Sequence, residues 1–296
     1  MYIQSLMVVL MAVVGQANPP GGQEAASSGE VRIIRNLAYV EGDKAHPLKH
    51  RLDLYLPSGK TCFPVLFFVH GGAWVHGDKD FLGLYAGLGK AFAKQGVGTV
   101  VINYRLTPEV KHPEHARDVA RAFQWTCAHI AEYGGDLERV VLCGHSAGGH
   151  LVSLVACNAD LQKETGIDPK RIKCVIPLSG VFKVRKGFLP PVFPTDSFGL
   201  NPSPVDLVRK GLPPFILVYA NGDLPTCGKS ECESFAGELK KCEVPVTNIE
   251  LTGTHVTTLL KAGQTSSPLM KAILKALHEP NPLPNPLPNP TMEKKP

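Results

Sequence analysis

The segment with the clearest chemical meaning is residues 140–150, VVLCGHSAGGH. Four apolar residues, typical of a buried strand, lead into Gly144-His145-Ser146-Ala147-Gly148, and the spacing beyond is helical. A serine in Gly-x-Ser-x-Gly between a strand and a helix is the pattern of a nucleophile elbow, in which side chains at 144 and 148 would collide with their neighbours. We therefore predict that Ser146 is a nucleophile, presented at a helix N-terminus where the N–H of Ala147 faces developing negative charge.

A second glycine-rich segment, HGGAW at residues 70–74, directly follows an apolar strand predicted at 64–69. Backbone of this kind at the end of a strand can direct successive N–H groups at one atom. We expect Gly72 and Ala73 to form an oxyanion hole together with Ala147, and because only backbone is needed, an alanine at position 73 serves as well as a glycine.

Aromatic and imidazole side chains flank both segments. His70 is interpreted as a brace for the loop rather than as a general base. Trp74 either packs beneath the loop or lines the acyl pocket, and His145 is a second candidate pocket residue. For both His145 and His150, a neutral imidazole satisfied by its neighbours is the favoured alternative.

A serine hydroxyl needs a base, and the base needs an acid that holds its tautomer. In this architecture the chain order is serine, acid, histidine. Asp223 follows a predicted strand at 215–219, and His255 follows the next predicted strand at 246–251. Both residues thus emerge from equivalent ends of successive strands, and we predict a Ser146-Asp223-His255 triad.

Other residues compete for the acid and base positions. Asp206 lies before its strand rather than after it, and Glu231 lies at the start of the following helix. His278 is the only other histidine beyond the acid, at the end of the last predicted helix. Their positions in the pattern make all three poorer candidates.

The elements that must position these residues alternate regularly between strand and helix. Residues 31–40 and 50–56 have the alternation of an antiparallel hairpin, with Leu52, Leu54 and Leu56 on one face. Continuous apolar runs at 64–69 and 98–102 are typical of strands buried on both faces of a parallel sheet. Further predictions complete the series: helices at 82–95, 113–133, 147–157, 231–241 and 269–277, and strands at 140–143, 174–178, 215–219 and 246–251.

This alternation predicts an α/β fold with a mostly parallel sheet flanked by helices. One domain spans residues 31–278. The irregular stretch 181–214 holds seven prolines, and we expect it to form a small lid over the site.

The composition of the chain limits the kinds of partner and cofactor that we expect it to bind. Lys plus Arg exceed Asp plus Glu by 31 − 26 = 5 among 296 residues, without a long basic run, so nucleic acid is not expected as a partner. No Cys-x-x-Cys pair or His-Glu-x-x-His helix supports a metal site, and no cofactor is expected. Eight cysteines are present, and we hypothesise a disulfide among Cys227, Cys232 and Cys242 that braces Asp223.

The chain resembles α/β-hydrolase-fold esterases in the segments HGGAW, GHSAGGH, SPVDLVRKGLPPFILVYANGD and LTGTH. These are similar to motifs of the hormone-sensitive-lipase-like group and its branch of kynurenine formamidases and feruloyl or acetyl-sugar esterases. HIAEYGGD at 129–136 and residues 68–74 are similar to isoprenylcysteine methylesterases. The resemblance implies an α/β-hydrolase fold and a metal-free Ser-Asp-His hydrolase acting through an acyl-enzyme. The chain departs from the group at Ala73, often glycine there, and has too few residues before its first strand for the group's helical cap.

We therefore expect a serine carboxylic-ester hydrolase whose partner is a small-molecule ester. A formamidase of the kynurenine formamidase type is the alternative, because the same groups cleave an activated formamide. A catalytically silent binding domain is a second alternative, against which the complete triad argues.

The two ends of the chain have a different character. Residues 6–15 form an apolar run of ten, about half the ~20 residues that cross a bilayer, so stable membrane insertion is not expected. Residues 1–17 are predicted to be a signal peptide of a secreted or periplasmic protein, with an uncleaved membrane anchor or a mistranslated start as the alternatives. Residues 18–30 are predicted to be a linker. Residues 279–296 contain seven of the 26 prolines, which predicts a disordered or polyproline tail.

Overall fold

The computed structural model describes residues 30–194 and 200–279. The predicted signal peptide at 1–17, nearly all of the linker and all but the first residue of the proline-rich tail lie outside the described residues, so these assignments stay predictions. Within the described residues, no helix is both long and apolar enough to cross a membrane.

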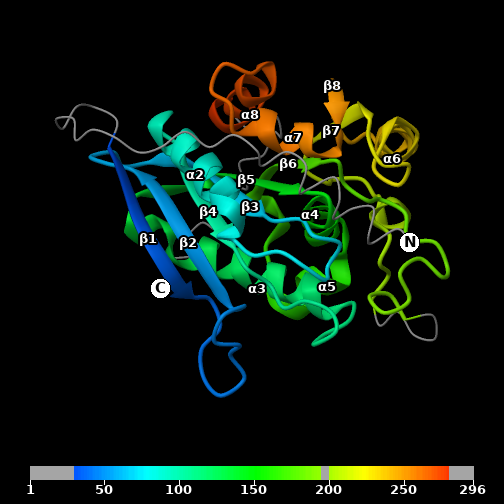
Figure 1. Ribbon diagram of the computed structural model, residues 1–296, viewed down its shortest axis with the longest axis horizontal. Helices are drawn as coiled ribbons and strands as arrows, with labels where there is room; N and C mark the ends of the chain where they lie inside the picture. The colour runs from blue at the N-terminus through cyan, green and yellow to red at the C-terminus, as the bar shows by residue number, and fades with distance from the viewer. Residues whose placement is uncertain (1–29, 195–199, 280–296) are drawn as a thin grey trace, which may run out of the picture.

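One eight-stranded sheet, in the order β1-β2-β4-β3-β5-β6-β7-β8, forms the centre of the described chain (Figure 1). β2 pairs antiparallel with both β1 and β4, and the other pairs are parallel. This confirms the predicted α/β class and its mostly parallel sheet. The strands are β1 Val31–Ala38, β2 Arg51–Pro57, β3 Phe63–Val69, β4 Gly98–Ile102, β5 Gly135–His145, β6 Ile172–Leu178, β7 Phe215–Gly222 and β8 Val246–Thr254.

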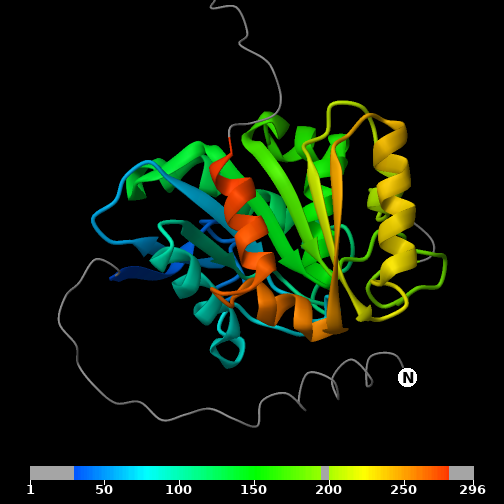
Figure 2. The same ribbon diagram turned by 90° about the horizontal axis from the view of Figure 1, so that it is seen from above.

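Helices cover both faces of the sheet. Apolar side chains of α2, α7 and α8 form one buried cluster on one face, and those of α3, α4, α5 and α6 belong to the cluster on the other. In Figure 1, α2 and α8 lie above the sheet and α3 and α5 below it, and Figure 2 shows α6 along the side of β7 and β8. The helices are α2 Leu84–Lys94, α3 Glu114–His129, α4 Ala147–Cys157, α5 Ala159–Thr165, α6 Lys229–Lys241, α7 His255–Ala262 and α8 Pro268–His278.

β3 shows why its sequence is a continuous apolar run. Successive side chains of a strand point to opposite faces, so Phe67 meets Phe123 of α3 edge-on with ring centroids 5.5 Å apart, while Phe68 lies 5.6 Å from Tyr85 of α2. Every residue of β3 is buried. The prediction of a strand covered on both faces is therefore confirmed.

β2 differs from the half-buried strand that its alternating sequence predicted. Every residue after Arg51 is buried, because α2 covers the second face. A Cβ on Gly89 of α2 would lie 2.5 Å from the Tyr55 ring. The charge of Asp53 on the same strand is tolerated in the interior because it forms a 3.0 Å ion pair with the equally buried Lys79.

The parallel strands place several connecting loops at one edge of the sheet. The segments that follow β3, β5, β6, β7 and β8 all leave from the carboxyl ends of those strands, where α/β folds build their sites. The residues predicted to carry chemistry come directly after four of these strands.

Candidate active site

Ser146 occupies the sharp turn between β5 and α4. Its φ of 56° and ψ of −118° lie in a region that non-glycine residues rarely adopt, and its N–H donates to Leu178 O of β6 over 2.8 Å. A Cβ on Gly144 would lie 2.4 Å from Gly148 O, and one on Gly148 would lie 2.1 Å from Val69 O. The turn thus has the strained backbone and the two obligatory glycines predicted for a nucleophile elbow.

Asp223 and His255 meet at the ends of β7 and β8. His255 is the first residue of α7, an element that the sequence pattern did not reveal, and its Nδ1 lies 2.6 Å from Asp223 Oδ1. With the Nδ1 proton donated to the carboxylate, Nε2 carries the lone pair. That Nε2 atom is buried and has no hydrogen-bond partner among the described residues, so it is the ring atom able to accept a proton.

Four donors hold the Asp223 carboxylate. Besides His255, Oδ1 accepts from Leu224 N (2.8 Å), and Oδ2 accepts from Ala220 N (3.1 Å) and Ser179 Oγ (2.6 Å). Burial by itself would raise the pKa of Asp223, but the hydrogen bond and electrostatic attraction from His255, the Ser179 hydroxyl and the Ala220 N–H outweigh burial and lower it. The carboxylate is therefore ionised at neutral pH.

Contacts through neighbouring residues link this pair to the turn that holds Ser146. His145, which precedes Ser146, donates from Nε2 to His255 O over 3.0 Å, and the two rings lie 4.8 Å apart. Ser179 follows the strand whose last residue, Leu178, accepts the Ser146 N–H, and it also bonds to Asp223. The structure therefore gathers the three predicted residues at one edge of the sheet.

The loop after β3 lies against the same turn. A Cβ on Gly71 would be only 3.2 Å from Ser146 Cβ. Gly72 and Ala73 have φ values of 117° and 52°, and Gly72 O accepts from the N–H groups of Val75 and His76, which closes the loop into a tight turn.

Three N–H groups are predicted to donate to an oxyanion, those of Gly72, Ala73 and Ala147. None of them has a hydrogen-bond acceptor among the described residues. His70 braces this loop as expected. Its Nδ1 donates to Gly71 O (2.7 Å), its ring stacks on Tyr104, and burial lowers its pKa to about 4, so it is neutral.

The two candidate pocket residues lie in the interior. Trp74 is 2% exposed and packs edge-on against His150 and Phe193, with ring centroids 5.1 and 4.9 Å away. His145 is 3% exposed and lies behind His255, and burial lowers its pKa to about 3. These contacts match the alternatives of a packed Trp74 and a neutral, satisfied His145.

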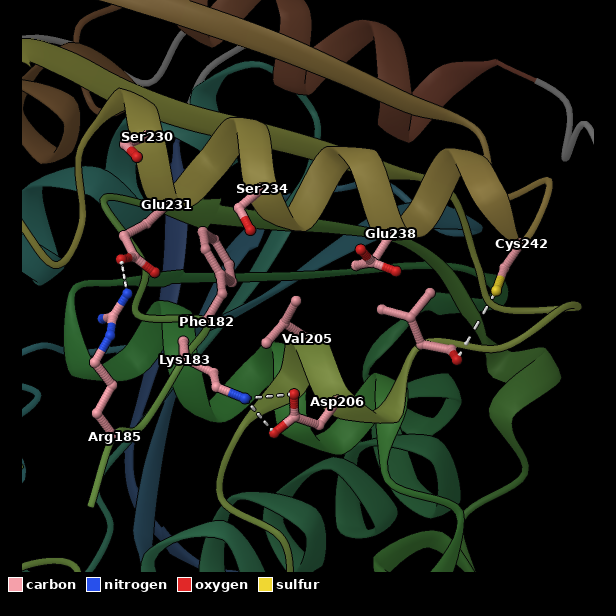
Figure 3. Close-up of a pocket in the computed structure, with 11 residues that line it drawn as sticks. Phe182, Lys183, Arg185, Val205, Asp206, Ser230, Glu231, Ser234, Glu238 and Cys242 are labelled. Carbon is pink, nitrogen blue, oxygen red and sulfur yellow. Dashed lines mark hydrogen bonds and ion pairs between the residues drawn. The ribbon is translucent and has the colours of Figure 1, made fainter.

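The described parts of segment 181–214 pack onto the molecule at several points. His150 of α4 donates to Pro202 O (2.7 Å), and His112 donates to Leu200 O (2.6 Å). Between this segment and α6 lies a pocket of about 620 Å³ (Figure 3). Ser146, Asp223 and His255 do not line it, so this pocket is distinct from the candidate active site.

Figure 3 also accounts for the two competing acids. Asp206 points at Lys183, with a 2.6 Å ion pair, and Glu231 at Arg185, with a 2.7 Å ion pair. Both carboxylates are thus occupied in the pocket beside α6, whereas Asp223 bonds to His255.

The hypothesised disulfide beside Asp223 is wrong, because all eight cysteines are free thiols. Cys232 and Cys242 are ten residues apart along and just beyond α6, roughly 15 Å at 1.5 Å per residue, which exceeds disulfide reach. The thiols instead lie against backbone: Cys232 Sγ is 3.7 Å from Cys227 O and Cys242 Sγ is 3.9 Å from Val208 O.

One group of side chains has metal-ligating atoms close together: Asp223, Cys227 and His255, all within 4.8 Å. Metal binding needs a thiolate and free carboxylate lone pairs. Burial, followed by the charge of Asp223, raises the pKa of Cys227 well above its usual value, and the carboxylate already accepts from four donors. The group is therefore organised as a hydrogen-bonded acid–base pair with a neutral thiol beside it.

Two residues of this site were missed from the sequence, Ser179 and Thr258. Ser179 has a φ of 50° and no exposed surface, and its hydroxyl bonds to both Asp223 and Thr258. A serine directly after a buried strand, followed by glycine, is the only local feature that could have marked it.

Comparison with known proteins finds relatives that share parts of the sequence and solved structures that share the fold. Residues 52–186 match the BD-FAE family model. The probable carboxylic ester hydrolase LipM of Mycobacterium tuberculosis is 33% identical over 236 residues, which cover 69% of this chain and 53% of LipM. The probable isoprenylcysteine alpha-carbonyl methylesterase ICMEL1 of Oryza sativa subsp. japonica is 33% identical over 158 residues, 53% of this chain and 35% of that protein. The chain thus spans about half the length or less of these relatives.

Solved structures match over most of the chain. Esterase B of Lactobacillus rhamnosis superimposes with a TM-score of 0.71 at 22% identity, covering 93% of this chain and 92% of the other. Esterase 2 of Thermogutta terrifontis gives a TM-score of 0.63 at 23% identity, covering 84% and 89%. At this identity the match establishes the fold. The chain therefore has the α/β-hydrolase fold, and parts of its sequence are similar to the BD-FAE family model and to proteins named as ester hydrolases.

Proposed function

We propose that the protein is a serine carboxylic-ester hydrolase that works through an acyl-enzyme. The observation that carries the proposal is the His255 ring, whose Nδ1 is held 2.6 Å from Asp223 while its buried Nε2 has no partner among the described residues. The same residue contacts His145, which directly precedes Ser146. A ring held in this way is arranged to accept the proton of a serine hydroxyl. The similarity to LipM, a probable carboxylic ester hydrolase, and to ICMEL1, a probable methylesterase, supports ester hydrolysis independently.

In this mechanism Ser146 Oγ attacks the ester carbonyl as His255 Nε2 takes its proton. Asp223 holds the imidazole in the correct tautomer and stabilises the imidazolium. The N–H groups of Gly72, Ala73 and Ala147 stabilise the oxyanion of the tetrahedral intermediate. His255 then protonates the departing alcohol, and water, activated by the same ring, releases the acid and restores Ser146.

The test compares the protein with its Ser146→Ala variant. A fluorophosphonate probe should label the protein and fail to label the variant, and turnover of p-nitrophenyl acetate should fall by at least about 10³-fold in the variant. Probe labelling that persists in Ser146→Ala would contradict the assignment of the nucleophile.

A second assay separates ester from amide chemistry. The protein should turn over short p-nitrophenyl esters faster than N-formylkynurenine. Faster hydrolysis of the formamide would replace the esterase with a formamidase that uses the same groups. Absence of any labelling or turnover would favour a non-catalytic binding domain.

A further inference from the structure

Ser179 lies where three elements of the site meet. It follows the last residue of β6, and its own N–H donates to Val218 O of β7 over 2.7 Å. The side chain has no exposed surface, and φ is 50°. A non-glycine residue in that conformation is strained. Such a conformation persists only where the contacts of the surrounding structure hold the residue in place.

The Ser179 hydroxyl has two close oxygen partners. Its Oγ lies 2.6 Å from Asp223 Oδ2 and 2.9 Å from Thr258 Oγ1. Ser179 has one proton, and it goes to the carboxylate because a hydrogen bond to a charged acceptor is the stronger one. Thr258 Oγ1 also lies 3.0 Å from His255 O, so its proton reaches either Ser179 Oγ or the backbone of His255.

The two hydroxyls thus connect the carboxylate to the first turn of α7, the turn that begins with His255. Without Ser179, Asp223 Oδ2 would keep only the longer bond from Ala220 N, at 3.1 Å. The carboxylate could then rotate about its terminal torsion, which is soft for aspartate, and Oδ1 would leave the line to His255 Nδ1.

We propose that Ser179, supported by Thr258, is a positioning residue that holds the Asp223 carboxylate in register with His255. The proposal rests on the proposed function, because it assigns Ser179 a role in the turnover of that site. Ser179 touches neither substrate nor the reacting atoms; it acts through Asp223.

The experiment uses two substitutions of Ser179. Ser179→Gly removes the hydroxyl and relieves the backbone at φ 50°, whereas Ser179→Ala removes the hydroxyl and keeps Cβ. Both should lower kcat for p-nitrophenyl acetate about tenfold, far less than the about 10⁴-fold expected when the acid itself is disabled. KM should stay within about twofold, because substrate contacts are unchanged.

The pH profile of kcat distinguishes positioning from a general structural defect. A carboxylate that turns away stabilises the imidazolium less, so the acid limb of the profile should move to lower pH in both variants. Thr258→Val should cause a smaller change in the same direction, and the conservative Thr258→Ser, which keeps the hydroxyl, should restore the wild-type profile.

A readout without substrate keeps the inference independent of turnover. The proton between His255 Nδ1 and Asp223 should give a strongly deshielded NMR signal in the full chain, and this signal should weaken or move upfield in Ser179→Gly. Wild-type kcat, pH profile and NMR signal in both Ser179 variants would overturn the inference, even if Ser146→Ala abolishes turnover. An unlabelled, inactive wild-type protein would instead refute the proposed function, while the NMR comparison still decides the role of Ser179.

Discussion

Replacing Gly148 with alanine tests the contact between the turn that holds Ser146 and the loop that follows β3. Gly148 lies in the first turn of α4, and a Cβ there would lie 2.1 Å from Val69 O and 2.6 Å from His70 O. Real Cβ contacts are essentially never closer than 3.0 Å, so the two backbones must separate by about 3.0 − 2.1 = 0.9 Å. Both sides of the contact are backbone, so a side-chain rotation cannot provide this space.

Gly237 of α6 is the matched control. It is also a helical glycine, but a Cβ there would meet nothing within 4 Å. Alanine in place of glycine in a helix contributes about 1 kcal/mol of stability, so Gly237→Ala should be stabilised by about 0.5–1 kcal/mol. At Gly148 the same gain is opposed by an overpacking cost of about 1–3 kcal/mol, which leaves Gly148→Ala destabilised by up to about 2.5 kcal/mol.

Activity should respond more strongly than stability. A displacement near 1 Å between Ser146 and the Gly72 and Ala73 N–H groups costs about 10²-fold in rate, so kcat/KM for p-nitrophenyl acetate should fall about 100-fold in Gly148→Ala and stay unchanged in Gly237→Ala. Urea denaturation measures stability, with equal m-values as the check that both variants unfold alike. If Gly148→Ala proves as stable and as active as Gly237→Ala, the reasoning from close contact is refuted.

Three further predictions concern pH, a buried ion pair and the thiols. Burial lowers the pKa of His70 and of His115 to about 4. Between pH 6.5 and pH 4 the unfolded chain therefore binds a proton at each of these histidines, whereas the native state does not. Each histidine lowers the free energy of unfolding by about 1.4 kcal/mol for every pH unit of acidification in this range. Urea midpoints should therefore fall from pH 7 to pH 5, and a midpoint that rises would contradict this. Lys79→Ala leaves buried Asp53 with the half-exposed Arg35 as its remaining ion-pair partner, so unfolding should become easier by about 3 kcal/mol; a loss below about 0.5 kcal/mol would show that the pair is dispensable. Alkylation in denaturant without reductant should label all eight cysteines by mass, and a smaller number would reveal a disulfide.

Much of the fold and site followed from local sequence. β3 and β4 were predicted because strands covered on both faces are continuously apolar, and α4 because its helical spacing follows the elbow glycines without a break. The order Ser146, Asp223, His255 followed from chemistry-bearing residues directly after strands. These features depend on residues adjacent in the chain, which is why spacing alone revealed them.

Other features depend on partners far away in sequence. The second face of β2 is buried because Tyr55 meets Gly89, more than thirty residues later, and nothing within β2 indicates that contact. His255 is the first residue of α7, a helix that the sequence pattern after the predicted strand at 246–251 did not indicate. The interior positions of Trp74 and His145 likewise follow from rings contributed by α4, segment 181–214 and His255.

Residue types and their order along the chain thus determined which groups are candidates for chemistry, because the proposed nucleophile, base and acid each follow a predicted strand directly. Only the tertiary structure decided how those groups are held: which oxygen of Asp223 faces His255, which hydroxyl fixes the other oxygen, and which acids are already paired elsewhere. The reason is physical, since hydrogen-bond direction and burial depend on the positions of atoms that the folded sheet, and not the sequence, brings together.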